Sequence, residues 1–101
     1  MTDLTPKMVG PLMRGLDMDL ADAVADAIIA DNPDSDVQVS DEGGYIRIQV
    51  PEYCRLTRQS LELELGREFP LVELEPALSG FAGRMKQVED DEIVWFLERK
   101  D

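Results

Sequence analysis

Residues 37–50 read VQVSDEGGYIRIQV, which is two alternating stretches joined by a turn. In the second stretch Ile46, Ile48 and Val50 alternate with polar or aromatic residues, and in the first stretch valines alternate with polar residues. A period of two is typical of a strand with one buried face, and DEGG is a turn sequence. The pattern predicts an antiparallel hairpin that ends at Pro51.

The residues before this hairpin predict a helix from Asp17 to Asp31. Its apolar residues recur at helical spacing and form one stripe: Leu20, Val24, Ala27 and Ile28. Three aspartates, Asp19, Asp22 and Asp26, share the opposite face, which we expect to be solvated. Because a residue before proline avoids the helical conformation, Asn32-Pro33 ends the helix.

A shorter helix is predicted after the hairpin. Thr57 is a suitable N-cap, Leu61 and Leu65 share one face, and Gly66 is placed as the C-terminal cap. A helical turn is expected around residues 71–74. These signals predict two consecutive short helices. The second is expected to be short because Pro76 prevents a longer continuation.

The last third predicts a second hairpin. Residues 81–88 form one arm, the acidic sequence EDDE at residues 89–92 is the turn, and residues 93–97 form the other arm, rich in branched and aromatic residues. The complete order is strand, helix, two strands, two helices and two strands (β-α-β-β-α-α-β-β). This order predicts an α+β domain in which helices pack on a mostly antiparallel sheet.

The chain has 101 residues, so we expect one domain over residues 8–101, preceded by a mobile polar tail at residues 1–7. The short apolar segment from Met8 to Met13 lacks a helical period and is interrupted by glycine and proline. It has two interpretations that the sequence leaves open. It is either an edge strand packed on its own domain or an arm that contacts a partner.

The charge is strongly one-sided. Asp and Glu number 22 and Lys and Arg number 10, which gives a net charge of −12. Nucleic acids and anionic membranes are disfavoured as partners, because both need a basic protein surface. A basic protein partner fits, although a high charge also serves solubility alone. The sequence shows neither a signal peptide nor an apolar stretch of membrane-spanning length, so we expect a cytoplasmic protein.

The sequence contains no histidine and one cysteine, Cys54. The missing histidine excludes a Ser-His-Asp or Cys-His catalytic arrangement, and a lone cysteine forms neither an internal disulfide nor an ordinary zinc site. Gly80 and Gly83 lack the surrounding pattern of a phosphate-binding loop. We therefore predict that the chain is not an enzyme, with no catalytic, cofactor-binding or metal-binding residues.

The abundant carboxylates offer two alternative kinds of site. A paired-carboxylate site would draw on the acidic residues of the middle region, which also suit a solvated helix surface: Glu62, Glu64, Glu68, Glu73 and Glu75. A calcium loop at residues 31–36 would lack the glycine and the closing bidentate glutamate of the usual twelve-residue loop. Both alternatives are weaker than a non-enzymatic interpretation.

Several motifs in order resemble the effector (coupling) proteins of bacterial soluble diiron monooxygenases, the MmoB/DmpM-like family, and most of all those of toluene, aromatic and alkene monooxygenases. The resemblance extends over about residues 7–99. The motifs are Val9-Gly10-Pro11 with Arg14, Asp31-Asn32-Pro33, Tyr45-Ile46-Arg47-Ile48, Leu56-Thr57-Arg58, Leu65-Gly66-Arg67-Glu68-Phe69, Glu73-Leu74-Glu75 and Phe81-Ala82-Gly83-Arg84.

The resemblance implies a cofactor-free regulatory protein of α+β fold, monomeric when free. Its partner would be a diiron hydroxylase, whose substrate access, oxygen activation and regiospecificity it would tune. A Rieske-type ferredoxin would compete for an overlapping surface. The reaction would be the hydroxylation or epoxidation of a hydrocarbon, either in the breakdown of aromatics and phenols or in the oxidation of alkenes.

The resemblance also implies a docking surface. Its residues would be Met8, Val9, Gly10, Pro11, Leu12, Met13, Arg14, Asn32, Ser79, Gly80, Phe81, Ala82 and Gly83. Related proteins often carry serine where this chain has Gly80, which puts a side-chain hydrogen bond from that position to the hydroxylase in doubt. Small residues allow close backbone approach and Phe81 suits an anchor, although a tight turn with Phe81 in the core explains the same residues.

Two other classes of function stay open from the sequence. An acidic interaction protein that mimics a polyanion would present its charge on one continuous face and bind a basic partner. A small enzyme would need a cleft that holds two acids. The substrate of the whole system is not determined by this chain.

Overall fold

The computed structural model describes residues 7–15 and 17–97, so the predicted tail lies outside the described residues apart from Lys7. Ten elements follow one another along these residues: β1 (Met8–Arg14), α1 (Met18–Asp31), β2 (Gln38–Asp41), β3 (Tyr45–Pro51), β4 (Tyr53–Thr57), α2 (Arg58–Leu65), η1 (Leu71–Ala77), β5 (Leu78–Ala82), β6 (Arg84–Val88) and β7 (Glu92–Phe96). The predicted α+β class is confirmed, and each strand pairing is antiparallel.

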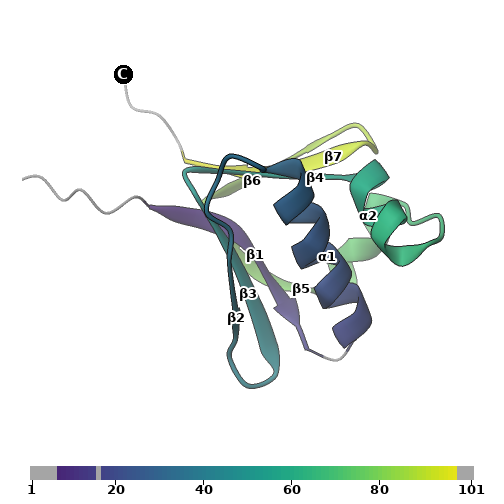
Figure 1. The fold of residues 1–101 in the computed structure, drawn as a ribbon, viewed down its shortest axis with the longest axis horizontal. Helices are drawn as coiled ribbons and strands as arrows, with labels where there is room; N and C mark the ends of the chain where they lie inside the picture. The colour runs from purple at the N-terminus through teal and green to yellow at the C-terminus, as the bar shows by residue number, and fades with distance from the viewer. Residues whose placement is uncertain (1–6, 16, 98–101) are drawn as a thin grey trace, which may run out of the picture.

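The strands form two sheets. The larger one has the order β2-β3-β1-β5 and the smaller one has the order β4-β7-β6. Figure 1 shows the smaller sheet at the top of the molecule and α1 running alongside the larger sheet, with α2 beside it. Each sheet therefore buries one face and leaves the other open.

The predicted helix and its buried stripe are confirmed in α1. Asp17 is the N-cap, and its Oδ1 accepts a 3.0 Å hydrogen bond from the backbone nitrogen of Leu20. The apolar stripe is buried, whereas Asp19, Asp22 and Asp26 are exposed. Burying each large apolar side chain stabilises the fold by roughly 1.5–3 kcal/mol, which is what holds α1 in place.

The predicted caps of α2 are also confirmed. The Thr57 Oγ1 accepts a hydrogen bond from the backbone nitrogen of Ser60, and Gly66 ends the helix in the left-handed conformation at φ 72°. Leu61 is buried and Leu65 lies partly buried against the core. The expected helical turn is longer than predicted and is a 3₁₀ helix, η1.

Two features of the strands differ from the expectation. Residues 53–57 form a strand, β4, immediately after the hairpin, and Glu52, with a positive φ of 65°, lies where the chain passes from the larger sheet to the smaller one. The predicted arm at residues 81–88 is divided at Gly83 between β5 and β6, which belong to different sheets. The second hairpin is therefore formed by β6 and β7 alone.

The core lies between α1 and the buried faces of the two sheets. The largest fully buried side chain is Trp95, the chain's only tryptophan, which is paired across the strands with Cys54 and Met85. Its indole Nε1 has no hydrogen-bond partner among the described residues. No helix in the described part of the chain combines the length and apolar character needed to cross a membrane.

Candidate docking surface

The two segments that the sequence predicted for docking are neighbouring strands. β1 pairs with β5, so that Gly10 lies opposite Ala82, Pro11 opposite Phe81 and Leu12 opposite Gly80. The ladder is irregular at Ser79, because Leu12 pairs with Gly80 and Met13 pairs with Leu78. The fold thus brings together residues that are about 70 positions apart in the sequence.

Most side chains of β1 are not available to a partner. β1 is an interior strand between β3 and β5, so it is neither an edge strand nor a free arm. Val9, Pro11 and Met13 are essentially fully buried. Arg14 is exposed, and Met8 and Leu12 are partly exposed, so only these three side chains of the predicted segment reach the surface.

Gly10 is explained by packing within the domain. Its φ is +142°, and a Cβ at this position would lie 2.2 Å from the carbonyl oxygen of Ile48. The glycine therefore lets β1 approach β3 closely, whatever else this segment does. Gly83 has a similar role, since a Cβ there would lie 2.6 Å from a methyl carbon of Val9.

The segment from Ser79 to Gly83 is more accessible, because β5 is an edge strand. The Phe81 side chain is 48% exposed, Ser79 and Gly83 are exposed, and Gly80 and Ala82 are partly exposed. A half-exposed phenylalanine on a paired strand is a rigid apolar contact, which is the property of an interface anchor. The alternative prediction, a tight turn with Phe81 in the core, is wrong, because about half of this side chain is exposed.

Asn32 holds the fold together. It is buried, with 8% exposure, and its Nδ2 donates to the carbonyl oxygens of Ile28 (2.7 Å) and Arg55 (2.8 Å), while its Oδ1 accepts from the Arg55 nitrogen (3.1 Å). The neighbouring Asp31 accepts hydrogen bonds from Thr57 and Ser60. The acid-amide pair at the end of α1 therefore fastens this helix to β4 and α2, and the Asn32 amide has little capacity left for a partner.

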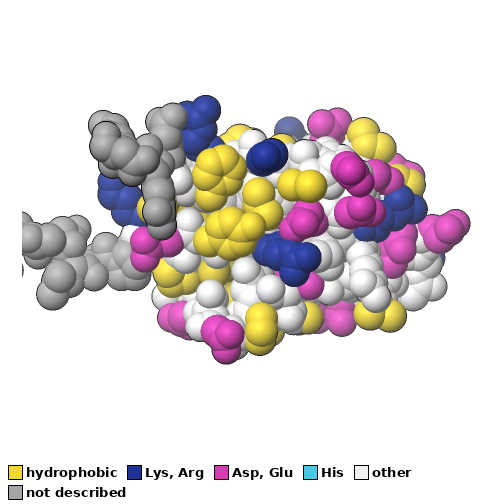
Figure 2. Space-filling model, turned by 90° about the horizontal axis from the view of Figure 1, so that it is seen from above, with side chains coloured by type: hydrophobic (Ala, Val, Ile, Leu, Met, Phe, Trp, Pro, Cys, Tyr) yellow, Lys and Arg dark blue, Asp and Glu magenta, His cyan; other side chains and the backbone are white. Residues whose placement is uncertain are grey.

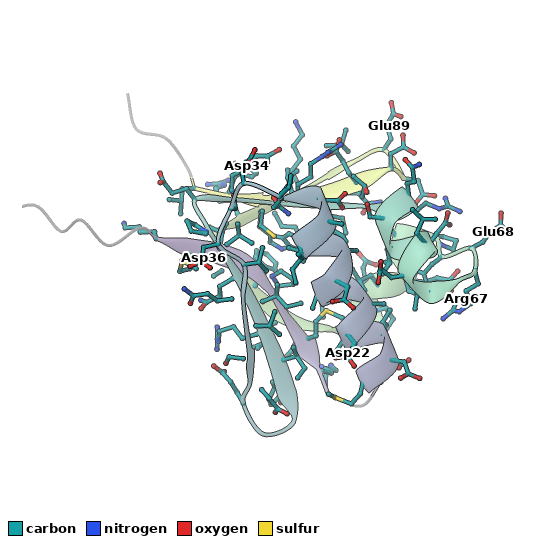
Figure 3. The ribbon with its side chains drawn as sticks, viewed as in Figure 1. Asp22, Asp34, Asp36, Arg67, Glu68 and Glu89 are labelled. Carbon is teal, nitrogen blue, oxygen red and sulfur yellow. The ribbon has the colours of Figure 1, made fainter. Side chains whose placement is uncertain are left out.

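The carboxylates do not converge on a catalytic centre. Figure 3 labels Asp22 on α1, Asp34 and Asp36 in the loop after it, Glu68 beyond α2 and Glu89 at the β6–β7 turn, and they point outward from these separate elements. Among the described residues no group of three or more His, Cys, Asp or Glu side chains is placed to hold a metal ion. Within the described residues the carboxylates therefore form no cation cage, although Asp19, Asp22, Asp26 and Glu64 line one hollow between α1 and α2.

A polar groove of about 440 Å³ lies where α2 begins beside β4 and β7. Its cations are already paired, because the Arg55 Nε donates to Glu92 (2.7 Å) and the Arg58 Nε donates to Glu62 (2.8 Å), with Asp90 also bound to Arg58. The Glu62 Oε2 accepts from the backbone nitrogen of Phe69 as well (2.7 Å), and this bond and Arg58 lower the pKa of Glu62. The groove is a structural ion-pair network that links α2 to its neighbours.

Cys54 is buried, and burial together with the negative charge of Asp31 raises the pKa of its thiol to about 12. A nucleophilic cysteine needs a lowered thiol pKa, so this environment makes the thiol inert. Cys54 is therefore a small core residue.

The open face of the smaller sheet was missed by the sequence analysis. Cross-strand pairs place alternate residues of β4, β6 and β7 together on this face: the exposed Tyr53, Arg55, Arg84 and Lys86, the partly exposed Phe96 and the buried Val94. Figure 2 views the molecule from this side and shows a group of yellow side chains with both dark blue and magenta ones around it. The alternation of residues 53–57 is the signal that would have found it, but its strand was not predicted.

Comparison with known proteins gives consistent matches over almost the whole chain. The family model described as MmoB/DmpM family matches residues 7–96. The protein named alkene monooxygenase system, effector subunit, of Xanthobacter autotrophicus (strain ATCC BAA-1158 / Py2) is 48% identical over 94 residues, which cover 93% of this chain and 90% of that protein.

Solved structures match as well. A chain in a phenol hydroxylase–regulatory protein complex superposes with a TM-score of 0.74 at 25% identity, covering 91% of this chain and 100% of that chain. The soluble methane monooxygenase regulatory protein B superposes with a TM-score of 0.66 at 16% identity, covering 96% of this chain and 71% of that chain, and shows a shared fold.

Proposed function

The chain belongs to the MmoB/DmpM family, and on this premise we propose that it is the non-catalytic effector component of a multicomponent monooxygenase. The observation that carries the proposal is its 48% identity, over nearly its full length, to an alkene monooxygenase effector subunit. The absence of histidine from the sequence and the dispersed carboxylates agree with a regulatory role.

The partner in this proposal is the diiron hydroxylase component. A chain in a phenol hydroxylase–regulatory protein complex shares the fold, which supports a hydroxylase partner for this chain as well. The proposed contact uses the accessible residues of the predicted docking set on the edge strand β5, chiefly Phe81 and Ser79. Leu12 and Arg14 on β1 are also accessible, but they lie on the opposite face of the sheet from Phe81, which pairs with the buried Pro11.

The proposed mechanism is differential binding. A protein without catalytic groups alters a reaction only if it binds one conformation of the enzyme more tightly than another, and it shifts that equilibrium by no more than the difference in affinity. Docking over the hydroxylase would favour one arrangement of the helices around its metal centre. Substrate access, oxygen activation and regiospecificity would change together, because all three depend on that arrangement.

The finer parts of the proposal concern the rest of the system. The effector is a cytoplasmic monomer when free, works without a cofactor, and shares part of its hydroxylase surface with a Rieske-type ferredoxin. The system hydroxylates or epoxidises a hydrocarbon, and the similarity to an alkene monooxygenase subunit supports epoxidation of an alkene first, with aromatics and phenols as the alternative substrates.

Reconstituted turnover tests this function. The hydroxylase, reductase and ferredoxin of the same organism are assayed with and without the chain, and the rate, the product distribution and the ratio of product formed to NADH consumed are measured. We expect the chain to change at least one of the three with saturation at a stoichiometric ratio. A chain that binds the hydroxylase and leaves all three unchanged is an acidic binding protein and not an effector.

A further inference from the structure

The two sheets end in strands that differ in how well their outer edges are protected. Among the described residues, β2 and β5 form the margins of the larger sheet (Figure 1), and β4 and β6 form those of the smaller one. Native edge strands usually carry charged side chains, which hinder the addition of a further strand. β2, β4 and β6 each contain a charged residue, whereas β5, with the sequence LSGFA, contains none. β5 is therefore the edge that is open to strand pairing.

Pro11 decides which backbone groups point to this edge. In an antiparallel pair of strands, opposite residues that exchange two hydrogen bonds alternate with opposite residues that exchange none. Pro11 lies opposite Phe81 and has no N–H, so this pair is the kind without hydrogen bonds. The N–H and C=O of Phe81 therefore point away from β1, toward the free edge of β5. Within the described ranges no turn, loop or cap hydrogen bond involves either group.

The side chains beside this donor and acceptor leave room for a further strand. The Phe81 ring is 48% exposed on one face of β5. On the other face a Cβ at Gly80 would meet open space, and the side chain of Ala82 is small. A strand added here would contact an aromatic ring on one face and find space for a large side chain on the other. The register shift at Ser79 limits the regular part of the edge to Gly80, Phe81 and Ala82.

We propose that the free edge of β5 binds a short extended segment of the hydroxylase by strand addition. The backbone of this segment donates to the Phe81 carbonyl oxygen and accepts from the Phe81 N–H. The segment is uncharged where it pairs and places an apolar side chain beside the Phe81 ring, because β5 offers no charge to complement. The inference rests on the proposed function and adds that β5 binds the hydroxylase through its backbone as well as through its ring.

Three other occupants fit the edge less well. A second copy of this chain carries the same net charge of −12, and charges of this size repel the two copies. Residues 98–101 read ERKD, and four charged side chains are a poor match for an uncharged edge. The carbonyl oxygen of Lys7 accepts a 2.9 Å hydrogen bond from the nitrogen of Glu52, which directs the start of β1 toward β3 and away from β5.

Amide hydrogen exchange in the full chain tests the strand pairing. In the free chain we expect the Phe81 amide to exchange at nearly the rate of an unstructured peptide, because it points away from β1. With saturating hydroxylase we expect this exchange to slow at least about tenfold. The amides of β2, the other margin of the same sheet, are the internal control and should keep their exchange rates.

Two substitutions of one residue separate the backbone contact from the side-chain contact. Phe81→Ala and Phe81→Pro both remove the ring, but only Phe81→Pro also removes the N–H, and an edge strand tolerates proline where the N–H points outward. We expect Phe81→Pro to bind the hydroxylase at least about tenfold more weakly than Phe81→Ala. Fluorescence of the buried Trp95 verifies that both variants are folded, and the exchange measurement decides alone if the proline variant is not.

The outcomes distinguish the inference from the function on which it rests. A Phe81 amide that is already protected in the free chain would mean that a second copy or another segment of this chain occupies the edge. Unchanged exchange on binding, or equal affinities of the two folded variants, would mean that only side chains dock. Each of these results overturns the inference while the effector function stands, whereas failure of the unmodified chain to bind the hydroxylase overturns the function itself.

Discussion

The side-chain amide of Asn32 forms a two-way clamp on the backbone of Arg55. It donates to the Arg55 carbonyl oxygen at 2.8 Å and accepts from the Arg55 nitrogen at 3.1 Å, as a neighbouring strand would. The C-terminal end of α1 is thereby joined to β4, a residue range that lies 23 positions later in the chain. The clamp thereby fixes the position of the smaller sheet relative to α1.

We expect Asn32→Ala to destabilise the fold by about 2–3 kcal/mol, because both backbone groups of Arg55 lose their partner in a largely buried site, while the Ile28 carbonyl oxygen keeps only its bond from the backbone nitrogen of residue 32. Urea unfolding followed by Trp95 fluorescence measures the change. Asp34→Ala, which changes an exposed residue two positions later, is the control and should alter the free energy of unfolding by no more than about 0.5 kcal/mol. Equal stability of the two variants would show that the clamp contributes little.

Gly10→Ala should destabilise the chain by about 3 kcal/mol or more, since the new Cβ would meet the Ile48 carbonyl oxygen and a positive φ would be imposed on alanine. Gly80→Ala on the neighbouring strand is the control, because its φ is ordinary and a Cβ there meets open space. Thermal unfolding of both proteins compares them. A tolerated Gly10→Ala would contradict the close approach of β1 to β3.

The pKa of Glu62 is lowered by the Phe69 backbone hydrogen bond and by Arg58. A carboxyl with a folded-state pKa below its unfolded value, here about 4.5, stabilises the fold above that pH. This contribution is lost as the pH falls through the lowered folded-state pKa. Stability measured as a function of pH should therefore decrease less steeply below pH 4.5 for Glu62→Gln than for the unmodified chain.

The control for this titration is Glu64→Gln, which neutralises an exposed carboxylate on the same helix. We expect its stability to decrease below pH 4.5 as steeply as that of the unmodified chain. If Glu62→Gln also shows the same decrease in stability below pH 4.5, the hydrogen bond from Phe69 does not stabilise the carboxylate.

Cys54 should resist thiol reagents in the folded chain, because burial raises its thiol pKa to about 12 and leaves almost no thiolate at pH 8. We expect its reaction with a chromogenic disulfide reagent to be at least about a hundredfold slower than that of the urea-unfolded chain, in which the same thiol is free. Comparable rates in the two states would show that the thiol is accessible.

Phe81→Ala should weaken hydroxylase binding by about 1–2 kcal/mol, which is roughly a tenfold change in Kd, while the stability changes little because half of the ring is already exposed. Leu63→Ala on α2 removes an even more exposed apolar side chain (75% exposed) and serves as the control. If both variants bind the hydroxylase with the same affinity as the unmodified chain, β5 is not part of the interface. Val9→Asp cannot replace this test, since Val9 is buried and the variant would unfold.

The local signals in the sequence predicted the local structure well. The stripe of α1, the Thr57 and Gly66 caps and the alternating hairpin are encoded within a few neighbouring residues, and each is present in the structure. β4 was not predicted, because it begins after a positive φ at Glu52. Glutamate rarely adopts this conformation, and no local sequence pattern predicts it here.

The candidate docking set was predicted only in outline. Its two segments form one pair of strands, but the pairing places Phe81 and Leu12 on opposite faces of the sheet, because Phe81 lies opposite Pro11 and Leu12 lies opposite Gly80. Pro11 is an example, since proline usually marks an edge strand and here it lies in an interior strand, where β5 and β3 flank it. The roles of the remaining exposed residues stay predictions until binding is measured.

The sequence by itself determined the fold class, the boundaries of α1 and the first hairpin, and the absence of histidine chemistry, because these depend on composition and on spacing over a few residues. Only the tertiary structure decided that β1 is interior, that Asn32 is a clamp and that Arg55, Arg84 and Lys86 share one face. These features arise from contacts between segments that are far apart in the chain, and such contacts are selected by the packing of the whole core.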